Sequence, residues 1–331
     1  MKKDVRMIAI AMAVLLLAGM VMSCGRSEEV DIHTPGYNDT SEVVMIDLAL
    51  EMVPLTETPA MFTGVSMPSA PGTQVKSNSK AEIDHSNAAD GYVMVRYKNS
   101  INKKLKVKII GPSSVEYTYN LKQDATYEVF PLSDGNGTYT INVYENIEGN
   151  RYSTAFSTSI TVTLNDEFAP FIRPNQYVNY KPDSQVVAKA AELTAGIEDL
   201  KGKIAAIYSF IVMYFSYDRE LAANVQSGYL PDVDAVLEKG KGICFDYAAV
   251  MASMLRSQEI PTRLVVGYAG TAYHAWIDVY SEEEGWINSY IFFDGEHWQL
   301  MDPTFASTGG QSSSVIQYIG DGSNYSAKYL Y

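Results

Sequence analysis

The hydrophobic pattern changes part-way along the chain, and this change limits the possible folds more than any other feature. Between residues 86 and about 165, short segments rich in β-branched and aromatic residues recur, such as Tyr92–Tyr97 and Gly137–Tyr144. From residue 183 onward, apolar residues recur at helical spacing, as in Leu200–Phe215. We therefore predict an all-β domain over residues 86–168, followed by a domain of helices and strands over residues 169–331.

The all-β domain contains several short strands at regular spacing, separated by turn residues such as those at 134–137. This pattern is typical of a small β-sandwich of the immunoglobulin or fibronectin type. No residues in it suggest catalytic chemistry. We expect a packing or spacer role, with carbohydrate or protein binding as the alternative.

The N-terminus predicts export. A basic segment (Lys2, Lys3, Arg6) precedes an apolar run, Met7–Met22, which is shorter than the roughly 20 residues that span a bilayer. Such a run is typical of a signal peptide, and it ends at Cys24 after small Ser23, which resembles a lipobox. We predict a lipoprotein signal peptide over residues 1–23 and a lipid on Cys24 that anchors the exported protein to the membrane. An ordinary signal peptide with an incidental cysteine is the alternative.

Residues 24–85 lack sustained periodicity and are rich in Ser, Thr, Pro, Gly, Asp and Glu. This composition predicts a low-complexity stalk between the membrane and the folded body. The formal net charge of the chain is −14. An acidic chain repels phosphate backbones, so nucleic acid is excluded as an expected partner.

The chain has two cysteines, and a lipid on Cys24 would leave Cys244 without a partner. Cys244 follows Gly240 and Gly242 and begins a helical pattern that continues to about Ser257. Unpaired N–H groups and the dipole at a helix start favour a thiolate, and glycines leave room for a substrate backbone. These features indicate a nucleophilic cysteine, against the alternative of a buried, inert one.

A histidine and an aspartate follow the cysteine on predicted strands. In His274–Tyr280, alternate residues fall on opposite faces, with His274 and Trp276 on the same face. Pro303 ends a later strand, so Asp302 is expected at a strand end, on rigid structure. Between these two strands we expect an extra hairpin near the site, from Ser281 to Glu296.

These segments resemble the three core motifs of the transglutaminase-like superfamily: Gly242-Ile243-Cys244-Phe245-Asp246-Tyr247-Ala248, His274-Ala275-Trp276, and Trp298 followed by Asp302-Pro303-Thr304. The three motifs occur in the family's order, and Arg256–Tyr268 also matches the segment that connects the first two. The resemblance covers about residues 183–308. It implies an α+β domain with a papain-like core, in which a helix carrying the cysteine packs on an antiparallel sheet carrying the histidine and aspartate.

The resemblance also implies a mechanism. Cys244 would attack an amide carbonyl and form a thioester, His274 would transfer protons, and Asp302 would orient the imidazole. Water as the acceptor gives hydrolysis and an amine gives cross-linking, and the triad does not distinguish them. Peptides, proteins and the peptides of peptidoglycan are the expected substrates, and no cofactor is expected.

Several assignments have alternatives. The Cys244 backbone N–H can serve as one oxyanion donor. Tyr217 is a candidate second donor, although a core tyrosine at a helix end fits its context equally well. His297 competes with His274 as the base but lacks the Ala-Trp context. A metal site built from these residues is a weaker alternative because the paired cysteine spacing of zinc sites is missing.

A non-enzymatic function also fits the sequence. Some transglutaminase-like domains are inactive, so the domain could be a catalytically silent binding or assembly module at the cell surface. No residue of the three motifs indicates a degraded site, and we favour the enzyme.

Overall fold

The structure, a computed structural model, describes residues 65–283, 285–288, 290–293, 298–300 and 325–331. All of them belong to one compact unit, residues 61–331. The predicted signal peptide and Cys24 lie outside the described residues. Among the described residues, no helix has the length and apolar character needed to cross a membrane.

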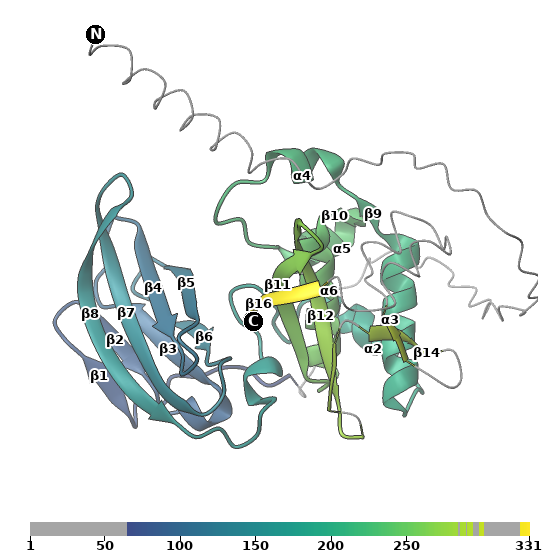
Figure 1. Ribbon diagram of the computed structural model, residues 1–331, viewed down its shortest axis with the longest axis horizontal. Helices are drawn as coiled ribbons and strands as arrows, with labels where there is room; N and C mark the ends of the chain where they lie inside the picture. The colour runs from purple at the N-terminus through teal and green to yellow at the C-terminus, as the bar shows by residue number, and fades with distance from the viewer. Residues whose placement is uncertain (1–64, 284, 289, 294–297, 301–324) are drawn as a thin grey trace, which may run out of the picture. The chain divides into compact units, whose positions relative to one another are not determined.

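The N-terminal described region consists of two four-stranded antiparallel sheets (Figure 1). The first sheet has the order β1-β2-β3-β6, with β1 at Val75–Ser77, β2 at Ala81–Asp84, β3 at Tyr92–Tyr97 and β6 at Glu128–Pro131. The second has the order β5-β4-β7-β8, with β5 at Glu116–Leu121, β4 at Leu105–Ile110, β7 at Gly137–Glu148 and β8 at Arg151–Val162. Short 3-10 helices lie at Ala88–Asp90 and Ala169–Phe171.

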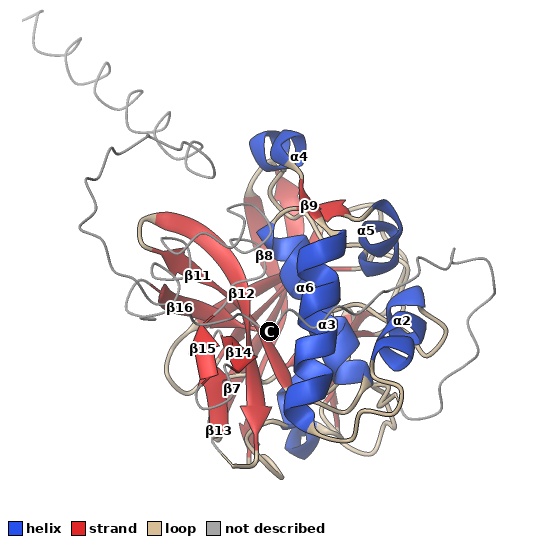
Figure 2. Cartoon of the chain, turned by 90° about the vertical axis from the view of Figure 1, so that its right-hand side faces the viewer, coloured by secondary structure: helices blue, strands red, loops and turns tan. Residues whose placement is uncertain are grey.

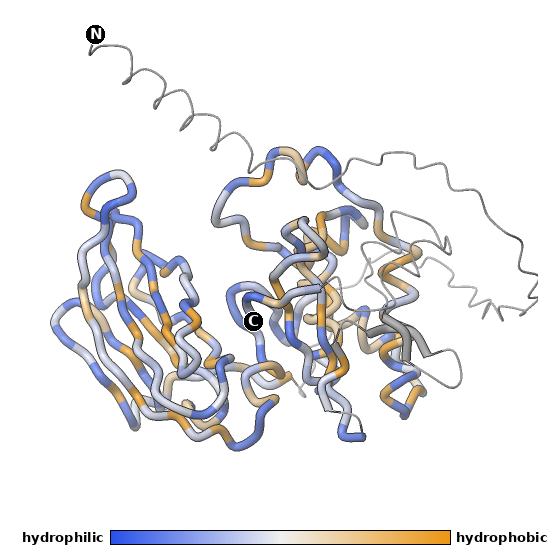
Figure 3. Tube along the Cα trace, viewed as in Figure 1, coloured by the Kyte–Doolittle hydropathy of each residue, from blue (hydrophilic) through white to orange (hydrophobic). Residues whose placement is uncertain are grey.

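Alternation along these strands creates the core of this region. In β5, for example, Tyr117, Tyr119 and Leu121 are buried while the residues between them are exposed. Figure 3 shows apolar positions distributed along the strands of both sheets. Burial of each large apolar side chain contributes about 1.5–3 kcal/mol, so period-2 patterning is the main reason for this β structure.

The first sheet begins earlier than the sequence indicates. Residues 75–84 were expected in the stalk, but they form β1 and β2. Ala81 and Ile83 are fully buried, and the Asp84 carboxylate accepts a hydrogen bond of 2.6 Å from the Gly72 N–H. The prediction of a stalk up to residue 85 is therefore wrong for residues 75–84, because these short strands gain stability only from pairing with β3.

A tyrosine hydroxyl organises the turn before β7. The Tyr139 hydroxyl donates toward the carbonyl oxygens of Leu132 (3.1 Å) and Gly135 (2.7 Å). It accepts a hydrogen bond of 2.9 Å from the Asp134 N–H. One buried side chain near the start of β7 thus satisfies backbone groups of the preceding corner.

The C-terminal region contains five α-helices among the described residues: α2 at Gln185–Leu193, α3 at Leu200–Tyr214, α4 at Arg219–Asn224, α5 at Val233–Lys239 and α6 at Cys244–Ser257. Aspartates cap three of them, because Asp199, Asp218 and Asp232 each accept a hydrogen bond from a first-turn N–H. Left-handed Gly240 ends α5, as the sequence predicts.

The strands of this region form one larger sheet and two small pairs. The four-stranded sheet has the order β13-β12-β11-β16 and is antiparallel, with β13 at Gly285–Asn288, β12 at Ala272–Ser281, β11 at Thr262–Ala269 and β16 at Tyr325–Leu330. The pairs are β9 (Ser216–Tyr217) with β10 (Lys241–Gly242), and β14 (Tyr290–Phe293) with β15 (Trp298–Leu300).

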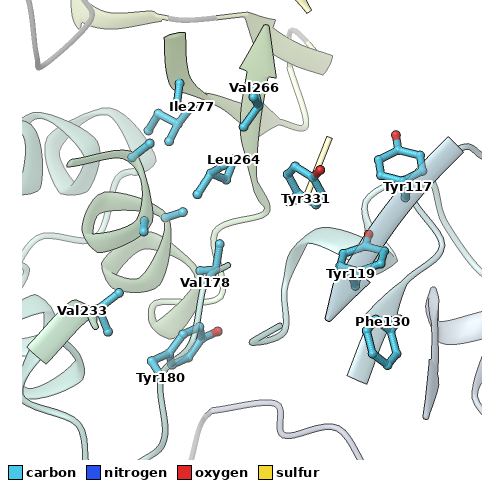
Figure 4. Close-up of a cluster of buried hydrophobic side chains, with 14 of the residues drawn as sticks. Tyr117, Tyr119, Phe130, Val178, Tyr180, Val233, Leu264, Val266, Ile277 and Tyr331 are labelled. Atoms are coloured by element: carbon cyan, nitrogen blue, oxygen red, sulfur yellow. The ribbon is translucent and has the colours of Figure 1, made fainter. Parts of the chain in front are cut away.

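Helix α6 is the centre of this region. It packs on β11 and β12 and is surrounded by α2, α3 and α5 (Figure 2). From Asp246 to Ser257 every residue of α6 is buried. Leu264, Val266 and Ile277 of the sheet belong to the same hydrophobic cluster (Figure 4). The expected helix on an antiparallel sheet is therefore present, with helices and sheet both contributing to the core.

The segment 166–182, which contains Pro170, Pro174 and Pro182, packs against the rest of the unit. Phe171, Val178 and Tyr180 are buried. The Arg173 carbonyl accepts a hydrogen bond of 2.7 Å from buried Arg256. This proline-containing segment is therefore a packed connection between the two regions.

Candidate active site

Cys244 is the first residue of α6, as the sequence predicts. It is a free cysteine with a half-buried side chain. The residue before it, Ile243, is extended and serves as the N-cap. The thiol therefore lies at the start of the helix, where solvent and reagents can reach it.

A buried carboxylate holds the loop before Cys244 in place. Asp246 is fully buried and accepts 2.8 Å hydrogen bonds from the Ile243 N–H and the Tyr229 hydroxyl. A Cβ at Gly242 would lie 2.6 Å from the Cβ of Asp246. Gly242 therefore makes room for this carboxylate, whereas the sequence suggested room for a substrate backbone.

Asp246 predicts a pH-dependent stability. Burial raises its pKa above the usual value of 3.8, although the hydrogen bonds from Ile243 and Tyr229 lower it. A raised folded-state pKa contributes stability that is present below pH 3.8 and is lost as the pH rises through the folded value. Asp246→Asn removes the charge and can keep both contacts, with its Oδ1 accepting from the Ile243 N–H and its Nδ2 donating to the Tyr229 hydroxyl. Relative to wild type, this variant should therefore become progressively more stable as the pH rises through that interval.

Urea unfolding at a series of pH values measures this difference. Tyr229→Phe provides a matched second variant. It removes a hydrogen bond that lowers the Asp246 pKa. In the wild-type background it should therefore enlarge the loss of stability that occurs as the pH rises. Combined with Asp246→Asn, it should leave the pH dependence of stability unchanged. A stability difference between Asp246→Asn and wild type that does not change with pH would contradict the assignment.

Tyr217 lies next to the cysteine loop. Strand β9 pairs with β10 in parallel, with Tyr217 opposite Gly242. The Ser216 N–H donates to the Gly240 carbonyl at 2.9 Å, and the Asp218 N–H donates to the Gly242 carbonyl at 2.8 Å. The half-buried Tyr217 is therefore held beside a residue that lies two positions before Cys244.

His274 lies near the start of β12, and its side chain is buried among aromatic rings. The Trp276 ring is nearly parallel to it, with centroids 6.4 Å apart, and the Tyr325 ring is also at 6.4 Å. Gly267 pairs with His274, and a Cβ there would lie 2.8 Å from the Trp276 ring. Glycine at 267 thus allows the indole to cover the strand beside the imidazole, which limits the access of water to it.

The fold brings the helix start and the start of β12 together. Arg256, near the end of α6, donates to the Thr262 carbonyl at the start of β11, so the start of α6 lies toward the other end of the β11–β12 hairpin, where β12 begins. Asp302 and His297 lie outside the described residues, so the acid of the predicted triad and the alternative base stay predictions. Within the described ranges, no group of three or more His, Cys, Asp or Glu residues could hold a metal ion.

The hairpin expected near the site, after β12, lies partly away from it. Strand β13 pairs with the far end of β12, where Trp286 is opposite Tyr280. Six residues separate Tyr280 from His274, which is about 20 Å along a strand. The Trp286 Nε1 donates to Glu167 at 3.0 Å, and the Arg263 guanidinium lies 3.5 Å from its ring centroid. Trp286 therefore belongs to a structural cluster away from His274 and does not line the site.

Sequence reasoning singled out none of four residues that the structure makes important: Asp246, Arg256, Tyr268 and Tyr273. Asp246 and Arg256 appear there only as members of the motif segments. Tyr268 and Tyr273 face each other across the β11–β12 turn. Gly270 could have revealed them as partners, because glycine favours a two-residue turn and the two tyrosines are equally spaced from it.

Comparison with known proteins agrees with this arrangement. A family model for the transglutaminase-like superfamily matches residues 187–303, a range that contains Cys244 and His274 on their packed elements. This part of the chain belongs to the transglutaminase-like superfamily. The predicted family is thereby confirmed, and the transglutaminase-like domain includes α6 and the sheet on which it packs.

Individual relatives are distant. A protein-glutamine gamma-glutamyltransferase of Pseudomonas aeruginosa is 32% identical over 69 residues, which are 17% of this chain and 10% of that protein. The chain thus spans about a tenth of the length of this curated relative. A candidate cysteine protease from Cytophaga hutchinsonii covers 78% of this chain and 74% of its own, with 15% identity and a TM-score of 0.37. The red sea bream transglutaminase covers 64% and 48%, with 13% identity and a TM-score of 0.29. Because both TM-scores are below 0.5, the assignment depends on the family model.

Proposed function

We propose that the transglutaminase-like domain is a thiol enzyme that acts on amide bonds of peptides, proteins or cell-wall peptides. The observation that carries this proposal is the position of Cys244, a free, half-buried thiol at the first residue of a 14-residue helix. A structural cysteine would more commonly lie inside the buried stripe of α6. The superfamily assignment supports the same reaction class.

In the proposed mechanism, the Cys244 thiolate attacks the carbonyl carbon of the amide. His274 holds the proton taken from the thiol and passes it to the nitrogen as the C–N bond breaks. The acyl group remains as a thioester on Cys244. Water or an amine then attacks the thioester, loses its proton to His274 and releases the thiol, so the enzyme is regenerated. Asp302 would orient the imidazole and stabilise its cation.

Mass spectrometry of the intact protein tests this proposal directly. After incubation with a glutamine-containing peptide or with cell-wall peptides, we expect an acyl adduct on Cys244 that disappears on addition of hydroxylamine. Iodoacetamide should also alkylate Cys244 in the folded protein, because the thiol is only half-buried. A thiol that reacts only after unfolding would exclude the enzyme and favour a silent binding module.

Tyr217 is proposed as the second oxyanion donor, beside the backbone N–H of Cys244. Its pairing opposite Gly242 supports this role. Tyr217→Phe is therefore expected to lower kcat about a hundredfold, because loss of one oxyanion donor costs roughly 10²–10³. The iodoacetamide rate should stay the same, since that reaction forms no oxyanion. Unchanged kcat in Tyr217→Phe would assign the ring to the core instead.

We propose a finer class for the N-terminal sheets as well, namely an immunoglobulin-like sandwich of the fibronectin type. The strand orders β2-β3-β6 and β5-β4-β7-β8 support it, as does the Tyr139 hydroxyl bonded to the corner before β7. A spacer or packing role is proposed for it. An experimental structure in which the two sheets do not face each other would contradict this class.

Export and anchoring through a lipid on Cys24 also stay a proposal, which the sequence of residues 1–24 supports. Cys24→Ser is expected to move the protein from the membrane fraction to the soluble extracytoplasmic fraction, because a lipid chain adds about 0.8 kcal/mol per buried methylene. Retention of the variant in the membrane fraction would contradict the anchor.

A further inference from the structure

Two exposed tyrosines face each other on the β11–β12 hairpin. Tyr268 is 41% exposed and Tyr273 is 56% exposed, and they are direct partners in the strand register. Their ring centroids are 5.5 Å apart with the planes at 67°. Among the tyrosines whose exposure the structure describes, only these two are exposed. The other described tyrosines are buried or half-buried, so an exposed pair indicates a binding role.

This tyrosine pair lies beside the nucleophile. Alternation places Tyr268 on the same sheet face as Val266, and Tyr273 on the same face as Ala275. Val266 and Ala275 belong to the hydrophobic cluster formed with α6. Arg256, near the end of α6, donates to the Thr262 carbonyl at the start of β11 at 2.8 Å. The helix start at Cys244 therefore lies toward the opposite end of β11, where the hairpin turns into β12. The pair therefore continues this face beyond the start of the helix, next to the thiol.

Strand pairing holds the two tyrosines in position without covering them. Tyr268 pairs with Tyr273 across the hairpin and with Ser326 of β16, the strand next to β11. The turn between the two strands has two residues, and Gly270 adopts the left-handed conformation that such a turn needs. A tight hairpin leaves the rings little freedom, so a ligand that binds them loses little conformational entropy.

We propose that Tyr268 and Tyr273 form an aromatic platform that binds an aromatic or large apolar side chain of the acyl-donor peptide, next to the amide that Cys244 attacks. The inference rests on the proposed function, because it takes Cys244 as the nucleophile. A ligand group that binds the tyrosines lies within one or two residues of the amide that Cys244 attacks. It is therefore a side chain of the same peptide, and we propose a peptide as the ligand of the platform. A pair of aromatic rings contributes binding free energy beyond that of its buried area. Such a platform would therefore prefer aromatic side chains.

Equilibrium binding to the Cys244→Ala protein tests the platform without any reaction. The probes are two N-acetyl tripeptide amides, Phe-Gln-Gly and Ala-Gln-Gly, titrated by calorimetry. We expect the Phe peptide to bind at least about tenfold more tightly, since each ring contact contributes about threefold to tenfold. In this background, Tyr268→Ala with Tyr273→Ala should remove the preference, and Tyr268→Phe with Tyr273→Phe should keep it.

Tyr152→Ala is the matched control, because Tyr152 is a half-buried tyrosine on β8 and should not change the preference. A preference that persists in the double alanine variant would overturn the platform, and so would equal binding of the two peptides by the parent. Tyrosine-dependent binding of a peptidoglycan disaccharide, with no peptide preference, would overturn the assignment to a peptide.

Iodoacetamide alkylation of proteins that retain Cys244 separates the two proposals. The double alanine variant should react at the wild-type rate, since the reagent is too small to need the platform. If Cys244 is unreactive while the tyrosine-dependent preference is present, the platform is supported and the enzymatic proposal fails. If Cys244 reacts and the preference is absent, the platform alone fails.

Discussion

Replacing Cys244 with alanine is expected to lower amide turnover at least about a thousandfold, because loss of the nucleophile in a triad leaves only binding and oxyanion stabilisation. Structure around the position should change little. Cys244 is half-buried at the start of α6, where removal of a sulfur leaves no large enclosed cavity. Turnover of a glutamine-containing peptide, followed by ammonia release, measures the loss.

The second cysteine provides the control for this variant. Cys24→Ser should keep full turnover and one alkylatable thiol in detergent solution, since Cys24 lies outside the transglutaminase-like domain that matches at residues 187–303. Far-ultraviolet circular dichroism should be the same for both variants. Turnover above about a tenth of wild type in Cys244→Ala would show that another group is the nucleophile.

Replacing Arg256 with alanine is expected to destabilise the protein by about 3–5 kcal/mol. Arg256 is 2% exposed, and its guanidinium donates to the backbone carbonyls of Thr262 (2.8 Å), Arg173 (2.7 Å) and Tyr331 (2.6 Å). These carbonyls come from three separate segments of the chain. Alanine would leave a cavity and three buried acceptors without their donor, which is the costly kind of loss.

Burial lowers the pKa of Arg256 to about 10, so the side chain is still a cation at neutral pH. Arg256→Lys keeps the charge, but a single ammonium cannot reproduce the planar fork that reaches three carbonyls. We expect the free energy of unfolding of Arg256→Lys to lie between those of the wild type and Arg256→Ala. Urea unfolding measures all three proteins.

Arg219 is the matched control, because it is an exposed arginine on α4 of the same domain. Arg219→Ala should change the free energy of unfolding by no more than about 0.5 kcal/mol. A loss below about 1 kcal/mol in Arg256→Ala would mean that water satisfies the three carbonyls, and that Arg256 is not the clamp that the hydrogen bonds suggest.

The helix and strands of the active-site region follow closely from local sequence. The pattern that begins at Cys244 predicts a helix to Ser257, and α6 has these bounds. The alternation over His274–Tyr280 predicts a strand, and β12 extends it by two residues at the start and one at the end. Such features depend on neighbours along the chain, namely on helical or period-2 spacing and on turn residues, so sequence alone can predict them.

Other features depend on residues that are distant in sequence. The stalk prediction failed at residues 75–84 because β1 is ordered by pairing with β2, and β2 by pairing with β3. The hairpin after β12 was expected near the site, but the register puts Trp286 opposite Tyr280, far along the strand from His274. Short segments of this kind carry little local preference, so their partners decide where they lie.

The sequence by itself determined the family, the order of Cys244, His274 and Asp302, and the helix start at Cys244. Periodicity and motif spacing depend only on the order of residues along the chain, so a single sequence is enough to find them. Only the tertiary structure decided that Gly242 makes room for Asp246, that Arg256 joins three segments, and that Tyr268 and Tyr273 stay exposed beside Cys244. These depend on which distant backbone and side-chain atoms meet, and a one-dimensional pattern does not contain that information.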